Sequence, residues 1–276
     1  MIKKLLMGVL PQNHLSFLVG LAVQKELPPP LAQKVIREFG KFYNINFAEA
    51  EKPVEDYKTL GEFFIRKLKP GLRPLADSPL LHPADSEITQ IGLIRKGQTV
   101  WAKGKNYSIP DLLGDEAQSQ AYEGGLWVTY YLCPTDYHRV HSPLDGSVEE
   151  IRHIPGKLWP VNSWSVHSVD DLFSVNERLV FHLKSRLGPA ALVMVGATNV
   201  GKMTTSLDES FKTNQLENTG SVKAYHPALP IQRGNEVGVF HMGSTVIMLY
   251  PKTIFEQKES WESFQGQKVR MGQALL

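Results

Sequence analysis

The spacing of hydrophobic residues changes character about a quarter of the way along the chain. In the first part, apolar positions recur every three or four residues, which places them on one face of an α-helix. After Pro28-Pro29-Pro30 this spacing predicts a helix with an apolar stripe formed by Leu31, Val35, Ile36, Phe39, Phe42 and Tyr43. Residues 1–75 are therefore predicted to form amphipathic helices. Such helices either pack on the rest of the protein or lie on a membrane surface, and the pattern permits both.

A second helix is predicted to begin after Thr59. Thr59 and Glu62 have the spacing of a capping box, in which each side chain accepts a hydrogen bond from a backbone N–H at the start of the helix. Pro70-Gly71 ends the pattern. The end of this helix is expected to hold three cations, which interact favourably with the helix dipole: Arg66, Lys67 and Lys69.

From about residue 76 the pattern becomes that of short strands separated by turns. The predicted strands are Glu87–Ile94, Gln98–Ala102, Leu126–Leu132, Gly146–Ile154, Leu179–Leu183, Ala191–Val195, Glu236–Phe240 and Val246–Tyr250. Ile109–Leu113, after Ser108, is predicted to be one short helix. Helices followed by many short strands predict an α+β protein, with a β-rich body, sandwich-like or barrel-like, over residues 76–276.

Composition narrows the class of protein. With 42% hydrophobic and 21% charged residues, the 276-residue chain is typical of a folded globular protein. A net charge of +2 is too small to predict nucleic-acid binding but permits a basic face towards an anionic membrane. The single cysteine, Cys133, allows no internal disulfide and is interpreted as a small apolar filler. The N-terminal MIKKLLMGVLP lacks a cleavage site and is expected to be retained, and no apolar run of about 20 residues predicts a spanning helix.

Two histidines lie in a segment bracketed by prolines, Pro134 to Pro143, which reads PTDYHRVHSP. Prolines restrict the backbone and hold the side chains of a loop in fixed directions, which suits a functional site. His138 and His141 do not by themselves predict zinc, because a zinc site needs a third ligand and the helical HExxH frame is absent. No metal is therefore predicted.

Asp85, His141 and Ser244 supply the residue types of a hydroxyl nucleophile activated by an oriented base. The G-x-S-x-G elbow of α/β-hydrolases is absent, since the sequence around Ser244 reads Met-Gly-Ser-Thr-Val. Ser244 directly follows Gly243 and enters a predicted buried strand. Because a glycine tolerates strained backbone conformations, this placement favours attack on the peptide bond between Gly243 and Ser244.

Such an attack predicts a built-in prosthetic group. The hydroxyl of Ser244 would convert the Gly243–Ser244 amide to an ester, and β-elimination would leave a dehydroalanine that hydrolyses to a pyruvoyl group. A ketone of this kind forms a Schiff base with a substrate amine and accepts the electron pair released when CO₂ leaves. Ser244 is therefore a candidate precursor of the cofactor.

These motifs resemble those of the bacterial phosphatidylserine decarboxylase proenzymes, and the resemblance runs along nearly the whole chain. The matching segments are PAD at Pro83–Asp85, DYHRVHSP at Asp136–Pro143, GSTVI at Gly243–Ile247, KGKNYS at Lys103–Ser108, NER at Asn176–Arg178, VGATNVG at Val195–Gly201 and FFIRKLKPGLRP at Phe63–Pro74.

The resemblance implies a role for each candidate residue. Ser244 matches the serine that cleaves the chain and becomes the pyruvoyl group, and Gly243 matches the residue left at the end of the large chain. Asp85 and His141 match the acid and base of self-cleavage. His138 matches a second histidine, expected to assist decarboxylation or protonation of the substrate.

The resemblance also implies the reaction and its partners. The family converts phosphatidylserine to phosphatidylethanolamine and CO₂. The mature enzyme is expected to be a heterodimer of a large β chain, residues 1–243, and a small α chain, residues 244–276, with the possibility of further dimerisation. Residues 1–75 match the membrane-associating part. The expected location is peripheral, on the cytoplasmic side of the inner membrane and its anionic surface.

Two other classes of function remain open from the residues alone. Ser244 could act as the nucleophile of a serine hydrolase on an external ester or amide. Alternatively, the β-rich body could be a non-catalytic domain that docks on membranes, with Ser244 capping a strand. Denaturing mass analysis separates these readings, because only self-processing yields two chains.

Overall fold

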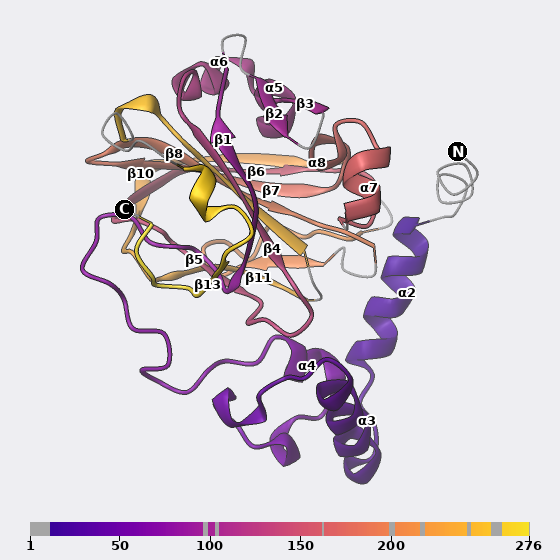
Figure 1. The fold of residues 1–276 in the computed structure, drawn as a ribbon. Coiled ribbons are helices and arrows are strands. Elements are labelled where there is room, and N and C mark those ends of the chain that lie inside the picture. Colours follow the sequence, from indigo (N-terminus) through magenta and orange to yellow (C-terminus); the bar gives the residue numbers. More distant parts are fainter. Residues whose placement is uncertain are drawn as a thin grey trace.

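The computed structural model describes residues 12–95, 99–102, 105–161, 163–198, 202–215, 219–241, 244–254 and 261–275. A group of helices from the N-terminal part lies at one end of a larger body built on antiparallel strands (Figure 1). A long irregular connection runs from the last of these helices to the first strand (Figure 1). The predicted α+β class is confirmed.

The N-terminal part contains α2 (Gln12–Gln24), α3 (Pro29–Phe42), α4 (Leu60–Phe64) and the 3-10 turns Phe47–Glu49 and Val54–Asp56. As predicted, α4 begins at a cap, since the backbone N–H of Glu62 donates to Thr59 Oγ1 over 3.0 Å. The Glu62 carboxylate accepts from Lys58 N, one residue earlier than a capping box requires. The stripe expected on α3 is not one buried face, because Ile36 is buried whereas Leu31 and Phe42 are exposed.

The main sheet has eight antiparallel strands in the order β10-β6-β7-β8-β12-β4-β1-β13. In chain order they are β1 (Ser86–Leu93), β4 (Leu126–Leu132), β6 (Gly146–Ile154), β7 (Arg178–Ser185), β8 (Gly188–Val195), β10 (Ser221–Ile231), β12 (Ser244–Tyr250) and β13 (Lys268–Val269). The terminal strands β10 and β13 are not paired with each other in the described part of the chain. The sheet is therefore open, and the barrel-like expectation was wrong.

A smaller sheet covers one face of the main sheet. Its strands are β5 (Arg139–His141), β11 (Glu236–Phe240) and β9 (Met203–Thr205), in that order. Val140 of β5 and Phe240 of β11 belong to the same buried cluster as Val246 and Met248 of β12. The two sheets therefore share a core, and that core holds the strand carrying the candidate histidine His141.

The opposite face of the main sheet packs on a second core. Ile247 and Leu249 of β12 point into it, because successive side chains of a strand point to opposite faces. The run Val246–Tyr250 is continuously apolar because both faces are buried. The elements outside the two main sheets are β2 (Thr99–Ala102), β3 (Lys105–Ser108), α5 (Ile109–Leu113), α6 (Glu116–Ser119), α7 (Ser163–Ser168), α8 (Leu172–Val175) and the 3-10 turns Gln120–Tyr122, Lys252–Ile254 and Glu262–Phe264.

Candidate active site

The start of β12 brings the candidate cleavage point next to the histidine segment. The backbone of Ser244 pairs with Leu132 at the end of β4, and the chain continues from there into the loop that carries His138. On the other side, the N–H of Phe240 donates to the carbonyl oxygen of His138 over 3.0 Å. Gly243 and the side chain of Ser244 lie outside the described residues. The backbone geometry thus brings both flanks of the cleavage point to the loop.

The loop after β4 is held by a carboxylate. Asp136 Oδ2 accepts a hydrogen bond from the backbone N–H of Cys133 over 2.7 Å. Burial raises the pKa of Asp136 to about 6, and the neighbouring charge of Asp85 adds to the effect, although the hydrogen bond from Cys133 opposes both. Burial also raises the pKa of the Cys133 thiol, which keeps it protonated at neutral pH. This state fits the interpretation of Cys133 as an unreactive residue.

His138 is fully buried and neutral. Its Nδ1–H donates to the carbonyl oxygen of Asp136 over 2.8 Å, which leaves the lone pair on Nε2. Nε2 is buried and has no hydrogen-bond partner among the described residues. Burial lowers the pKa of His138 to about 3, outweighing the hydrogen bond to Asp136. The ring lies against Phe64 of α4, with 4.1 Å between the ring centroids. His138 therefore has a free acceptor atom, Nε2, among the described residues, and its ring is covered by Phe64 of the N-terminal part.

His141 has both ring nitrogens engaged. Nδ1–H donates to the carbonyl oxygen of Gly234 over 2.8 Å, and Nε2 accepts from the hydroxyl of Tyr137 over 3.1 Å. Gly234 has a φ of 82°, a backbone conformation that favours glycine. Burial lowers the pKa of His141, although the Gly234 hydrogen bond opposes the shift. His141 is therefore a neutral imidazole whose basic nitrogen is Nε2.

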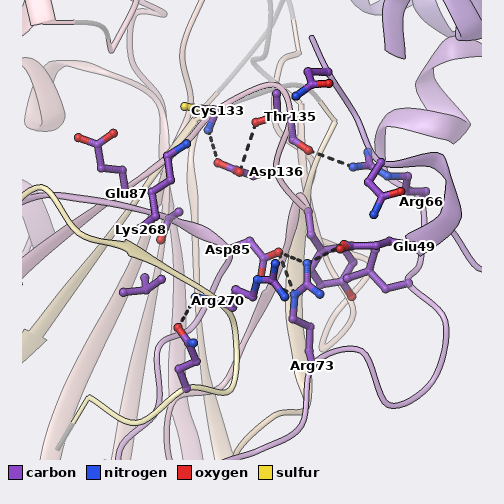
Figure 2. A pocket seen from close by; sticks show the side chains of 17 residues that line it. Glu49, Arg66, Arg73, Asp85, Glu87, Cys133, Thr135, Asp136, Lys268 and Arg270 are labelled. Carbon is purple, nitrogen blue, oxygen red and sulfur yellow. Dashed lines mark hydrogen bonds and ion pairs between the residues drawn. The ribbon is translucent and has the colours of Figure 1, made fainter. Parts of the chain in front are cut away.

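Asp85 is bound by an arginine of the N-terminal part. Arg73 Nε lies 2.9 Å and 3.0 Å from the two oxygens of Asp85, and Arg73 Nη2 lies 2.5 Å from Asp85 Oδ2 (Figure 2). Arg73 Nη2 also donates to Glu49 over 2.9 Å, and the backbone N–H of Met271 donates to Asp85 Oδ1 over 2.9 Å. Although burial alone would lower the pKa of Arg73, its pairing with Asp85 and Glu49 raises it.

The structure assembles the predicted triad only in part. The backbone N–H of His141 donates to the carbonyl oxygen of Pro83 over 2.8 Å, so His141 and the segment before Asp85 are neighbours. No hydrogen bond joins the side chains of Asp85 and His141 in the part of the chain that the structure describes. Asp85 accepts from Arg73 and Met271, and the ring nitrogens of His141 are engaged by Gly234 and Tyr137. The carboxylate still acts through space, since its charge raises the pKa of His141 against the effect of burial.

Sequence reasoning missed several residues at this site. Arg66 was expected at the end of a helix, but α4 ends at Phe64, and Arg66 is buried with its Nη2 donating to the carbonyl oxygen of Thr135 over 3.1 Å. Arg66 and Arg73 both lie in the segment FFIRKLKPGLRP, and Tyr137 lies in DYHRVHSP. The signal was therefore present in motifs whose individual contacts a sequence does not reveal.

A cavity of about 350 Å³ lies among these side chains. Its wall combines the N-terminal part, the start of β1, the loop after β4 and the C-terminal segment, as Figure 2 shows for Arg66, Asp85, Asp136 and Lys268. The volume falls within the range of about 300–1,000 Å³ that is typical of small-molecule sites. Among the described residues, no group of three or more His, Cys, Asp or Glu side chains has the arrangement of a metal site.

Comparison with known proteins identifies the family. The phosphatidylserine decarboxylase family profile matches residues 60–276. A phosphatidylserine decarboxylase proenzyme of Myxococcus xanthus is 42% identical over 98% of this chain and 96% of the relative. Proenzymes of the same name from Anaeromyxobacter sp. (42% identity, 88% of this chain and 86% of the relative) and Brevibacillus brevis (39%, 99% and 98%) are also similar. The chain belongs to the phosphatidylserine decarboxylase proenzyme family and is an enzyme of the decarboxylase class.

Proposed function

We propose that this chain cleaves itself between Gly243 and Ser244, and that Ser244 becomes a pyruvoyl group used to convert phosphatidylserine to phosphatidylethanolamine and CO₂. The observation that carries the proposal is the position of the start of β12. The backbone of Ser244 pairs with Leu132, where β4 runs into the segment of His138 and His141. The segment that follows Leu132 carries two buried, neutral histidines, His138 and His141.

His141 is the base that we assign to self-cleavage. Its Nδ1–H is held by Gly234, so Nε2 is the basic atom, and it must release the hydroxyl of Tyr137 before it accepts the proton of the Ser244 hydroxyl. The oxygen attacks the carbonyl carbon of Gly243, the C–N bond breaks, and the proton moves to the departing amine to leave an ester. Loss of the Ser244 α-proton expels the carboxylate of Gly243, and hydrolysis of the resulting dehydroalanine releases ammonia. Asp85 assists because its negative charge favours the protonated form of His141.

The surroundings fit a group that appears only after cleavage. When present, the pyruvoyl carbonyl supplies an electrophile for the substrate amine and a sink for the electron pair left by CO₂. His138 Nε2 is a buried acceptor without a partner among the described residues, as expected if its partner arrives with the substrate. Because His138 is neutral, it must first take a proton before it can return one to the substrate carbon.

The N-terminal helices support association with a membrane surface. Leu18 and Leu21 of α2 and Leu31 and Phe42 of α3 are between 47% and 81% exposed. Large exposed apolar residues of this kind favour contact with a lipid or protein surface. No helix in the described ranges is both long and apolar enough to cross a bilayer. We therefore propose that residues 1–75 hold the catalytic body, residues 76–276, peripherally on the anionic cytoplasmic face of the inner membrane.

Denaturing mass analysis together with a lipid assay tests the proposal. The wild-type protein should give two chains, residues 1–243 and 244–276, and the smaller should carry a blocked, ketone-bearing N-terminus. It should also release CO₂ from phosphatidylserine vesicles. Ser244→Ala should remain one inactive chain. A wild-type preparation that is active as one unbroken chain, or Ser244→Ala protein that is cut and active, would overturn the proposal.

A further inference from the structure

One buried arginine at the site, Arg66, has no counter-ion in contact among the residues that the structure describes. Arg66 is 5% exposed, and its single hydrogen bond among the described residues runs from Nη2 to the carbonyl oxygen of Thr135. Its Nε and Nη1 atoms are buried and have no hydrogen-bond partner in the part of the chain that the structure describes. The guanidinium carbon lies 5.1 Å from the ring centroid of Phe63, a cation–π contact that leaves these N–H donors unsatisfied.

The contrast with Arg178 shows that this fold satisfies an arginine when it buries one for structure. Arg178 is 3% exposed, and its three guanidinium nitrogens donate to four carbonyl oxygens, those of Leu112, Ser174, Asn176 and Asp111. Burying polar donors without acceptors is unfavourable, and more so when the group is charged. Arg66 therefore weakens the folded state unless a ligand supplies the missing acceptors.

Arg66 faces a place where a ligand fits. It lines the cavity of about 350 Å³ together with Asp85, Asp136 and Lys268 (Figure 2). Of the carboxylates there, Asp85 pairs with Arg73, whereas Asp136 and Glu87 line the wall without an ion pair among the described residues. Lys268 and Arg270 add cations to the same wall. Arg66 is the buried cation whose donors lack acceptors in the described part of the chain, so its guanidinium favours an anion over a metal ion or a cation.

We propose that Arg66 binds the phosphodiester of the lipid substrate, an inference that rests on the proposed function. Guanidinium groups match phosphate oxygens in geometry and charge. The serine carboxylate of the same headgroup is the weaker candidate, because its charge leaves with CO₂. A cation holding that carboxylate would stabilise the ground state more than the transition state and would slow the reaction. The phosphodiester keeps its charge throughout and can be held at every step.

Arg66 and the residue that covers His138 belong to one short segment, which places Arg66 close to the histidine loop. Phe64 covers the ring of His138, and Arg66, two residues further on, reaches the carbonyl of Thr135, three residues before that histidine. A phosphodiester on Arg66 therefore lies next to the loop that carries His138. In this arrangement Arg66 is a positioning residue, since it holds a part of the lipid that does not react.

The test uses the processed wild-type enzyme and the variants Arg66→Gln and Arg66→Lys, with phosphatidylserine diluted in neutral phosphatidylcholine vesicles. Arg66→Gln should raise KM for phosphatidylserine roughly tenfold or more, the effect of losing a charge-assisted hydrogen bond, and change kcat much less. Arg66→Lys should recover part of the affinity. Lys184→Gln removes an equally charged but exposed side chain from β7, outside residues 1–75, and should leave KM unchanged, which controls for the loss of one positive charge.

Soluble competitors identify the anion. Glycerophosphoserine and glycerophosphoethanolamine should both inhibit the wild-type enzyme, and Arg66→Gln should weaken both by a similar factor, because both carry the phosphodiester. Inorganic phosphate should inhibit less well than either. Thermal unfolding separates binding from structure: Arg66→Gln should keep or raise the melting temperature, whereas Arg178→Gln should lower it.

Several results would overturn the proposal. An unchanged KM in Arg66→Gln shows that the residue does not hold the substrate. Loss of inhibition by glycerophosphoserine alone assigns the carboxylate instead, and Arg66-dependent inhibition by inorganic phosphate alone assigns a free-anion site. A melting temperature lowered as far as in Arg178→Gln assigns a structural role. Failure of the proposed function is distinguishable, because wild-type protein would then release no CO₂ while the binding of glycerophosphoethanolamine still reports on Arg66.

Discussion

The ion pair between Arg73 and Asp85 should contribute more to stability than any surface pair, and replacing Arg73 by methionine tests this. The two side chains are 8% and 9% exposed, and Arg73 Nη2 lies 2.5 Å from Asp85 Oδ2. Methionine keeps much of the apolar volume but removes the charge. Arg73→Met therefore leaves Asp85 buried with the backbone N–H of Met271 as its remaining hydrogen-bond donor among the described residues. Glu49 loses the same partner.

The magnitude follows from the burial of the pair. Two unit charges about 4 Å apart attract by about 4 kcal/mol at an effective dielectric constant of about 20. Removing one partner of a buried pair typically destabilises a protein by about 3–5 kcal/mol, because the other charge is left without compensation. We expect Arg73→Met to lower the free energy of unfolding by about 3 kcal/mol. Combining it with Asp85→Asn should be about 2 kcal/mol less damaging than the sum of the single changes.

The assay is urea unfolding of each variant in a Ser244→Ala background, which keeps the chain in one piece. The matched control is the pair Arg37–Glu55, whose side chains are 49% and 51% exposed. A double-mutant cycle on that exposed pair should give about 0.2–1 kcal/mol and should weaken in 0.5 M salt. The Arg73–Asp85 coupling should persist in the same salt. A coupling below about 0.5 kcal/mol, or one as salt-sensitive as the control, would refute the reasoning.

Two further predictions concern the residues around the histidines. Gly234→Ala should lose about 1–2 kcal/mol of stability, because φ is 82° and a Cβ would lie 2.7 Å from Leu75 Cδ1. It should also cleave more slowly, because the Gly234 carbonyl holds His141. The control Gly266→Ala, with φ also 82° but open space around it, should lose stability and cleave normally. Equal cleavage rates would contradict the role of Gly234. As the pH rises from 4 to 7, the free energy of unfolding of Asp136→Asn should rise by about 2 kcal/mol relative to that of the wild type, as measured by urea unfolding. The folded-state pKa of Asp136, about 6, exceeds its ordinary 3.8, so the folded wild type binds an extra proton at low pH and loses stability as the pH rises through this window. A pH-independent difference would contradict the raised pKa.

Much of the fold was predictable because the sequence of most strands shows a recognisable apolar pattern bounded by turn residues. The predicted bounds of β4, β6 and β11 agree with the structure, since apolar patterns and turn residues define them locally. β10, Ser221–Ile231, was missed because it is an edge strand, mostly exposed and containing two prolines, and it becomes a strand by pairing with β6. β5 was missed because three residues carry no periodic pattern and are ordered by β11.

The candidate site was predictable as a set of residues but not as a set of contacts. Its histidines stood out in a proline-bracketed segment, whereas the partner of His141 Nδ1 is Gly234, 93 residues away. The pairing of Asp85 with Arg73 was not predictable either, since no pattern in the sequence links the two segments that carry these residues. Arg66 shows a different limit: the sequence placed it at the end of a helix as a cation that interacts with the helix dipole, and only the tertiary contact with Thr135 reveals that it is buried.

The predicted boundary at residue 75 separates two kinds of secondary structure but does not separate two functions. Phe64, Arg66 and Arg73 all come from the N-terminal side, and they contact His138, Thr135 and Asp85 in turn. The family match begins at residue 60, the first residue of α4, and therefore includes these contacts while leaving out α2 and α3. The exposed apolar residues of α2 and α3 suit a surface contact instead. If the proposed lipid enters past α4, it meets the cover of His138 by Phe64 and the guanidinium of Arg66 together, and our proposal then makes access and headgroup binding depend on one segment.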